Sequence, residues 1–314
     1  MSVLKSIMDF LARFAPQAMA GGVFVGLLFP GLSDLFWPML TPAVWGLLFL
    51  AMLRIDWVDM KARLRRPVFV AALLVWMLVV TPCMMAGILH FVDIRPGLEA
   101  AMVLTAASSS LFSTPVLALM FGLDAALLLI VLVAATLLVP ITMPLAALFL
   151  LGFDMGADPI ALMGRMSLLV LSAVICVFLV RRIFGMRRIM QKSSVIEGLS
   201  VILLILFAVA IMQGVTLRIL ADPLDIAYVA ALSFAAYIGL MLVSCAVFYW
   251  GVPEVGMRGA LSAGFISGTR NLAIILAVLP ASVDSDVPLF FAVGQFPIYI
   301  MPIILKPVFR RLLR

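Results

Sequence analysis

Charged residues are scarce in this sequence: they make up 11% of its 314 residues, whereas 66% are hydrophobic and the mean hydropathy is +1.30. A soluble globular chain carries roughly 25% charged residues, which cover its water-facing surface. The scarcity therefore excludes an ordinary soluble domain. The chain consists mainly of apolar segments, most of them as long as the roughly 20 residues that cross the hydrocarbon core of a bilayer. These segments predict an all-α polytopic membrane protein.

Residues that carry catalysis are equally scarce. The single histidine, His90, is expected at the outer end of a span, and Cys83, Cys176 and Cys245 lie in apolar segments without CxxC spacing. The sequence has no HExxH, nucleophile elbow or phosphate-binding loop. We interpret the acidic residues of 284–286 as a solvated turn rather than a metal site. A membrane-embedded enzyme is disfavoured, and no cofactor or metal is expected.

Hydropathy, interpreted together with proline, glycine and charge breaks, predicts ten spans. They are 16–31, 36–53, 67–91, 97–121, 125–151, 160–180, 195–217, 225–250, 257–280 and 287–306. The charged residues before Pro16 indicate a membrane-surface helix rather than a removable signal.

Lysine and arginine set the expected orientation. Seventeen of the 21 fall in alternate segments counted from the N-terminus, and only Arg95 and Arg218 fall in the opposite loops. Because basic loops stay in the cytoplasm, both termini are expected there, in a multi-pass protein of the cell membrane. The net charge of +6 lies at membrane edges, so it indicates the lipid bilayer as partner and not nucleic acid. A monomer is favoured, although nothing in the sequence fixes the oligomeric state.

Short sequence motifs recur at matching positions in the two halves of the chain. Pro140-Ile-Thr-Met-Pro144 in span five is matched by Pro297-Ile-Tyr-Ile-Met-Pro302 in span ten, and Val-Ala-Ala-Leu occurs at 70–73 and again at 229–232. Residues 1–151 and 152–314 are therefore predicted to be two repeats of five helices. Because five is odd, the second repeat would be inverted, which is typical of alternating-access carriers.

Spans four and nine are each interrupted by polar residues near their centres. Those of span four are Ser108, Ser109, Ser110, Ser113 and Thr114, and those of span nine are Ser267, Thr269, Arg270 and Asn271. Thr114-Pro115 has the residue types of a helix N-cap and first turn, so it predicts a new half-helix inside the membrane. Irregular backbone at that depth survives only when it is buried in protein or lines a cavity. The two interruptions are the predicted substrate site.

Arg270 lies near the centre of span nine, where an arginine costs roughly 2.5–3.5 kcal/mol on insertion scales. One interpretation is a fixed cation that faces a carboxylate or similar substrate group. The other is a structural arginine that holds loose carbonyls of its own broken helix or pairs with Glu99. Asn271 is either a substrate ligand or a cap for the second half-helix, and the serines and threonines either bind substrate or serve close helix packing.

Several short sequence motifs, found in the same order along nearly the whole chain, resemble motifs of the bile acid:sodium symporter family. They are Phe49-Leu-Ala-Met-Leu-Arg-Ile-Asp56, Arg66-Pro67, Thr81-Pro82, Asp124-Ala-Ala-Leu, Thr136-Leu-Leu-Val-Pro140 with Pro144, and Gly268-Thr-Arg-Asn271 with Ala273. The resemblance implies ten helices in a panel and a core domain, with helices four and nine crossing at the substrate and sodium sites.

The sequence departs from that family at its sodium ligands. The family's sodium positions fall on Met77, Thr114, Pro115, Leu128, Leu132, Ile266 and Arg270, and only Thr136 keeps a hydroxyl early in span five. Sodium needs several oxygen ligands, and a buried arginine beside the vacancy repels it. Sodium coupling, which the resemblance implies, is therefore doubted.

The sequence as a whole predicts a secondary transporter that moves a small organic anion, carboxylate-like or amphipathic, by alternating access. Its candidate substrate-binding residues are Ser109, Ser110, Ser113, Thr114, Thr136, Ser267, Thr269, Arg270 and Asn271. A proton-coupled or uncoupled carrier or exchanger of the same fold is the alternative to sodium symport. A channel is the rival from another class, but polarity confined to helix centres does not form the continuous stripe of a pore.

Overall fold

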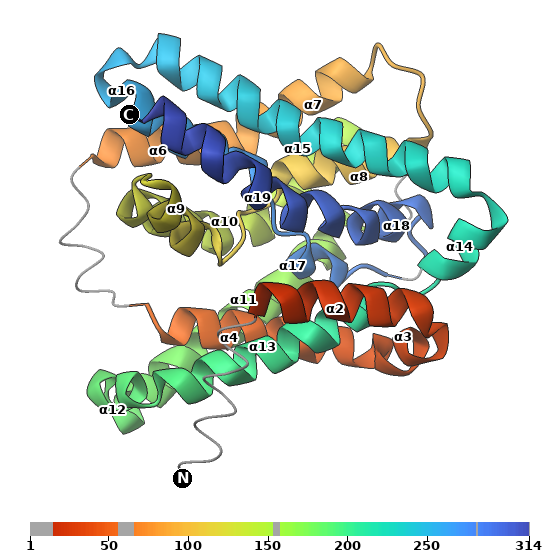
Figure 1. Cartoon of the computed structure of the whole chain (residues 1–314), viewed down its shortest axis with the longest axis horizontal. Helices are drawn as coiled ribbons and strands as arrows, with labels where there is room; N and C mark the ends of the chain where they lie inside the picture. The colour runs from red at the N-terminus through yellow and green to blue at the C-terminus, as the bar shows by residue number, and fades with distance from the viewer. Residues whose placement is uncertain (1–14, 56–65, 153–157, 281, 314) are drawn as a thin grey trace. The chain divides into compact units, whose positions relative to one another are not determined.

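The computed structural model describes residues 15–55, 66–152, 158–280 and 282–313, with the backbone alone for 15–20, and this described part contains helices and no strand (Figure 1). The helical elements in chain order are α2 (Ala15–Leu28), α3 (Pro30–Phe36), η1 (Trp37–Met39), α4 (Leu40–Leu53), α6 (Pro67–Val75), η2 (Trp76–Val80), α7 (Thr81–Leu89), α8 (Pro96–Ala107), α9 (Thr114–Phe121), α10 (Ala125–Leu151), α11 (Pro159–Phe184), α12 (Met186–Gln191), α13 (Ser193–Ala210), α14 (Val215–Ala221), α15 (Pro223–Gly251), η3 (Pro253–Val255), α16 (Gly256–Gly268), α17 (Ala273–Leu276), α18 (Asp286–Val293) and α19 (Gln295–Leu312). The surface helix expected before Pro16 lies almost entirely outside the described residues.

Seven helices, or runs of consecutive helices, in the described part are long and apolar enough to cross a membrane. They are Pro30–Leu53, Pro67–Leu89, Ala125–Leu151, Pro159–Phe184, Ser193–Ala221, Pro223–Gly251 and Asp286–Leu312. These seven correspond to seven of the ten expected spans and agree with a polytopic, all-α membrane protein. Of the other three, the first falls on the 14-residue α2, and the fourth and ninth fall on the pairs α8/α9 and α16/α17.

The chain divides into two compact units, and each unit takes residues from both halves of the sequence. Unit 1 comprises Met1–Asp56 and Leu168–Ile226, and unit 2 comprises Trp57–Ser167 and Ala227–Arg314. The predicted repeats, 1–151 and 152–314, are a different division of the chain and remain a prediction.

Close helix packing in unit 1 depends on small residues. A Cβ added to Gly26 of α2 would lie 2.8 Å from the carbonyl oxygen of Val209, and one added to Gly46 of α4 would lie 2.8 Å from Cδ1 of Leu203 in α13. Glycine lets helix backbones approach where lipid provides no hydrophobic drive. At the end of α4, the Arg181 guanidinium of α11 donates to the carbonyls of Met52, 3.1 Å away, and Leu53, 2.8 Å away, two of the terminal carbonyls of this helix.

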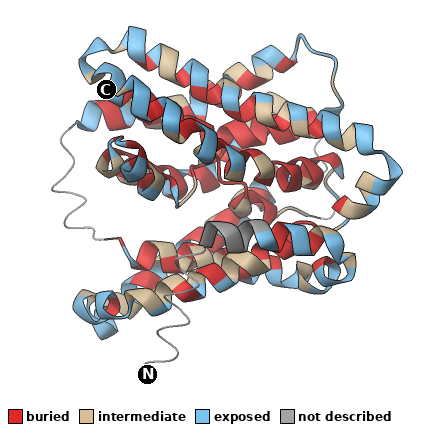
Figure 2. Ribbon diagram, in the orientation of Figure 1, coloured by how far each residue is buried: buried red, intermediate tan, exposed pale blue. Residues whose placement is uncertain are grey.

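Among the helices that the structure describes, the most buried lie in unit 2. Ten residues of α8 and ten of α16 are buried, and Figure 2 shows the ribbon of α8 largely in the colour of buried residues. The long α15 packs along α16 through glycine, since a Cβ on Gly264 would lie 2.7 Å from the carbonyl oxygen of Met241. The Trp76 indole also donates to the Ser244 hydroxyl at 2.7 Å. Unit 2 is therefore a packed core around the two broken helices.

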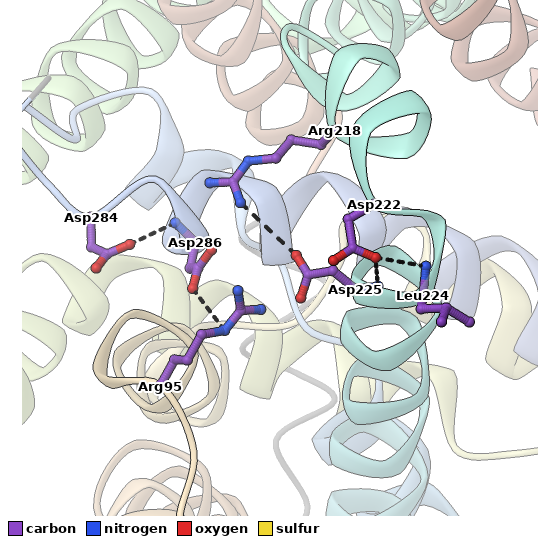
Figure 3. Close-up of polar contacts among 7 residues, drawn as sticks. All are labelled: Arg95, Arg218, Asp222, Leu224, Asp225, Asp284 and Asp286. Carbon is purple, nitrogen blue, oxygen red and sulfur yellow. Dashed lines mark hydrogen bonds and ion pairs between the residues drawn. The ribbon is translucent and has the colours of Figure 1, made fainter.

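Ion pairs lie at the starts of α8, α15 and α18 (Figure 3). In unit 2, Nε of Arg95 lies 3.2 Å from Oδ2 of Asp286, and Gly97 packs so closely that a Cβ there would lie 2.6 Å from the Asp284 carboxylate. The expectation of a solvated turn at 284–286 is wrong for Asp286, which is buried. In unit 1, Arg218 lies 3.9 Å from Asp225, and Asp222 accepts from the backbone of Asp225 at 3.0 Å, as a capping side chain does.

Candidate functional site

Both interruptions expected from the sequence are present in unit 2. Helix α8 ends at Ala107, Ser108 is extended with ψ 161°, and α9 begins at Thr114. Helix α16 ends at Gly268, and the short α17 begins at Ala273. We refer to residues 108–113 and 269–272 together as the crossing.

The two parts of the crossing are hydrogen-bonded to each other. The backbone N–H of Leu111 donates to the Thr269 carbonyl at 3.1 Å, and that of Asn271 donates to the Ser109 carbonyl at 2.8 Å. Between these bonds, Ser110 and Arg270 face each other as a single antiparallel bridge. Backbone groups released by each break are thus partly satisfied by the other break, which holds the two broken helices at a fixed position.

Arg270 is fully buried at the centre of the crossing, and its guanidinium contacts oxygen atoms from three segments of the chain. Nε donates to the Ser267 carbonyl at 2.7 Å, and Nη1 donates to the Ser108 carbonyl at 2.7 Å. Nη1 also approaches the Met77 carbonyl at 3.4 Å, and Nη2 donates to the Thr81 hydroxyl at 3.0 Å. Ser108 and Ser267 lie at the C-terminal ends of α8 and α16, where carbonyls lack helical partners. The arginine therefore closes both broken ends at once.

No carboxylate balances this buried charge within the part of the chain that the structure describes. The four acceptors of Arg270 are neutral, and Glu99 does not form the ion pair considered from the sequence. A guanidinium stays protonated in proteins, so its charge remains in the core of unit 2 without a counterion.

Three candidate residues form a closed hydroxyl cluster. The Ser110 hydroxyl lies 2.9 Å from that of Thr114 and 2.8 Å from that of Thr269, and it donates to the Thr269 carbonyl at 2.6 Å. Thr114 is the first residue of α9 and makes no side-chain cap, so the N-cap expected at Thr114 is wrong. Its hydroxyl bonds across the crossing to Thr269 at 3.0 Å instead.

The remaining candidates are placed differently. Ser113 is exposed, and the buried hydroxyl of Thr136 donates to the Leu132 carbonyl one turn earlier at 2.8 Å. The Asn271 side chain accepts from the backbone N–H of Ala273, the first residue of α17, at 3.1 Å. At the positions where the family resemblance places sodium ligands, Leu128, Leu132 and Ile266 are buried apolar side chains.

Four buried hydroxyls have no hydrogen-bond partner in the described part of the chain, and all lie in unit 2. They belong to Ser109, Ser233, Tyr237 and Ser267. Ser109 is in the crossing and Ser267 is two residues from it, while the carbonyl of Tyr237 would lie 3.1 Å from a Cβ on Gly268. Because buried polar groups are nearly always paired, these unpaired donors, of which Ser109 and Ser267 lie in or next to the crossing, need an explanation.

Sequence reasoning missed Ser233 and Tyr237, and also the contacts of Arg270 with Met77 and Thr81. One signal was available for the first pair. Ser233 and Tyr237 are four residues apart, so they share a face of the mainly apolar α15.

Comparison with known proteins finds no match among family models or curated proteins.

Proposed function

We propose that this protein is a secondary transporter of a small organic anion, with Arg270 as the fixed positive charge of its substrate site. The observation that carries this proposal is the fully buried guanidinium, whose four acceptors are all neutral. An anion that enters beside it gains the attraction of an uncompensated charge in a medium of low dielectric constant.

Unused donors beside Arg270 support an anionic substrate further. A guanidinium has five N–H groups, and one on Nη2 has no acceptor among the described residues. The unpaired hydroxyls of Ser109, Ser267 and Tyr237 add three more donors. A carboxylate accepts about four hydrogen bonds, so these groups match one substrate carboxylate.

The position of the guanidinium argues against sodium symport. Carbonyl and hydroxyl oxygens are the ligands that a hard cation prefers, and here Arg270 already binds the oxygens of Ser108, Ser267 and Thr81. A second cation beside Arg270 would be repelled by it. The transport cycle then runs by proton coupling, by exchange or by facilitated diffusion.

Alternating access fits the broken helices, because unwound segments near the bilayer midplane are typical of secondary transporters. The full proposal includes ten spans in two inverted repeats, a panel and a core domain, both termini in the cytoplasm and a location in the cell membrane. It includes no catalytic activity.

Thermal unfolding of the purified protein with a panel of organic anions tests the proposal. A bound anion stabilises the native state and raises Tm. Tyr237→Phe should weaken the anion affinity derived from this shift about tenfold to 100-fold, because a hydrogen bond to a charged group contributes about 1.5–3 kcal/mol. Ser113→Ala is the matched control, since Ser113 is exposed, and should respond as wild type does.

Uptake into proteoliposomes then separates a carrier from a channel. A carrier gives saturable uptake of the stabilising anion. Ohmic currents, or an anion response identical in wild type and Tyr237→Phe, would contradict the proposed site.

A further inference from the structure

Three phenylalanines tie together helices α9, α16 and α19 within unit 2. The ring centroids of Phe121 and Phe265 lie 5.2 Å apart, those of Phe121 and Phe309 5.7 Å apart, and those of Phe265 and Phe309 5.9 Å apart, all in edge-to-face geometry. Edge-to-face pairs add about 0.5–1.5 kcal/mol each beyond the area that they bury. The three rings therefore pack α9, α16 and α19 against one another.

A cavity of about 280 Å³, wide open to the surface, lies next to this triangle. It is lined by residues 119–122, by Arg258 of α16, by Arg310 of α19 and by Leu313, which follows α19. Gly122, with φ 79°, turns the chain at the end of α9. A second cavity of about 290 Å³ is lined by Lys306, Pro307, Arg310 and Arg311, so Arg310 borders both.

The basic side chains around these cavities have no acidic partner. Lys306, Arg310, Arg311 and Arg258 make no side-chain hydrogen bond or ion pair with any described residue. The nearby Asp124 carboxylate accepts from the Leu127 backbone at 3.1 Å, where it caps α10. The cavities therefore form a concentrated and uncompensated positive site.

The outward side of the same region is apolar. Val116, Leu119 and Met120 of α9 are exposed, and so are Val308 and Leu312 of α19. In a membrane-spanning protein, such side chains face acyl chains. A basic cavity between spans, bordered by lipid-facing residues, has the two features that an anionic phospholipid requires.

We infer that the cavity between α9, α16 and α19 binds the phosphate headgroup of an anionic phospholipid, held chiefly by Arg258 and Arg310. The acyl chains lie along the exposed face of α9. Because α9 and α16 are halves of the two broken helices, a bound lipid connects the ends of α9 and α16 that lie away from the crossing, through one headgroup. The site is separate from the crossing, and its test requires no knowledge of the transported substrate.

The test measures Tm of purified protein in a neutral detergent as phosphatidylglycerol is added, with phosphatidylcholine as the neutral lipid. Phosphatidylglycerol should raise Tm and phosphatidylcholine should not. Arg258→Gln and Arg310→Gln should each weaken the apparent lipid affinity about fivefold, and the double variant about 25-fold. Both arginines are exposed, so the variants are expected to fold.

Two controls decide the outcome. Arg188→Gln removes an exposed arginine of α12 that borders neither cavity, and it should leave the lipid response unchanged. Glycerol 3-phosphate and inorganic phosphate replace the lipid in parallel titrations and should have no effect. An equal loss in Arg188→Gln would show general surface attraction, and an equal response to inorganic phosphate would show a free-phosphate site; either result overturns the inference.

Discussion

Replacement of Arg270 with methionine separates the electrostatic role of this residue from its structural role. The variant leaves the carbonyls of Ser108 and Ser267 without their donor, whereas the Met77 carbonyl keeps the Thr81 hydroxyl. Two unpaired buried carbonyls cost about 2–6 kcal/mol. Removal of a buried charge returns roughly 2.5–3.5 kcal/mol. The free energy of unfolding should therefore fall by no more than about 3.5 kcal/mol, and the protein should still fold.

In Arg270→Met, the affinity for the anion should change by a larger free energy than the removal of a surface charge would cause. At a separation of about 5 Å and an effective dielectric constant of about 20, one unit charge contributes about 3 kcal/mol, which is more than 100-fold in Kd. Arg270→Lys keeps the charge and should bind within about tenfold of wild type, although an ammonium cannot reach all the acceptors that the guanidinium reaches.

The assay compares Kd for the stabilising anion by calorimetry in wild type, Arg270→Met and Arg270→Lys. Arg165→Met is the control, because Arg165 also lies within a span but is exposed. If Arg270→Met folds and binds the anion within threefold of wild type, Arg270 has only a structural role and the reasoning is refuted.

Three further predictions concern packing, and thermal unfolding checks each. Gly268→Ala should destabilise the protein by about 1–3 kcal/mol, because the new Cβ would lie 2.6 Å from Cβ of Met241; an unchanged Tm would show that α15 and α16 are not in close contact. Gly87→Ala, in a helix with open space around it, should raise stability by up to about 1 kcal/mol, and a loss would indicate an unseen neighbour. Arg181→Gln should lower stability by about 1.5–3 kcal/mol because the terminal carbonyls of α4 lose a charged donor, and no change would show that these bonds contribute nothing.

Much of the fold followed from the sequence, because the membrane imposes strong local rules. Long apolar runs predicted the seven spans, and polar residues at the centres of the fourth and ninth segments predicted their breaks. The end of the first span was placed less well. The span was expected to run to residue 31, but α2 ends at Leu28 and Pro30 begins a separate helix.

The partners of the site residues did not follow from the sequence, because they are set by distant packing. Nothing near Arg270 in the chain indicates that its guanidinium reaches the Thr81 hydroxyl, 189 positions away. Ser110, Thr114 and Thr269 looked like substrate ligands, yet each bonds to the others once the two breaks meet. Tyr237 resembled an ordinary aromatic of an apolar helix, and only its burial shows an unpaired hydroxyl.

The most direct test is uptake of the stabilising organic anion into proteoliposomes in which sodium is replaced by potassium on both sides of the membrane. We expect unchanged, saturable uptake, since the guanidinium of Arg270 already binds the carbonyls of Ser108 and Ser267 and the Thr81 hydroxyl, so these oxygens are not free to bind sodium. Uptake that disappears without sodium would contradict this expectation.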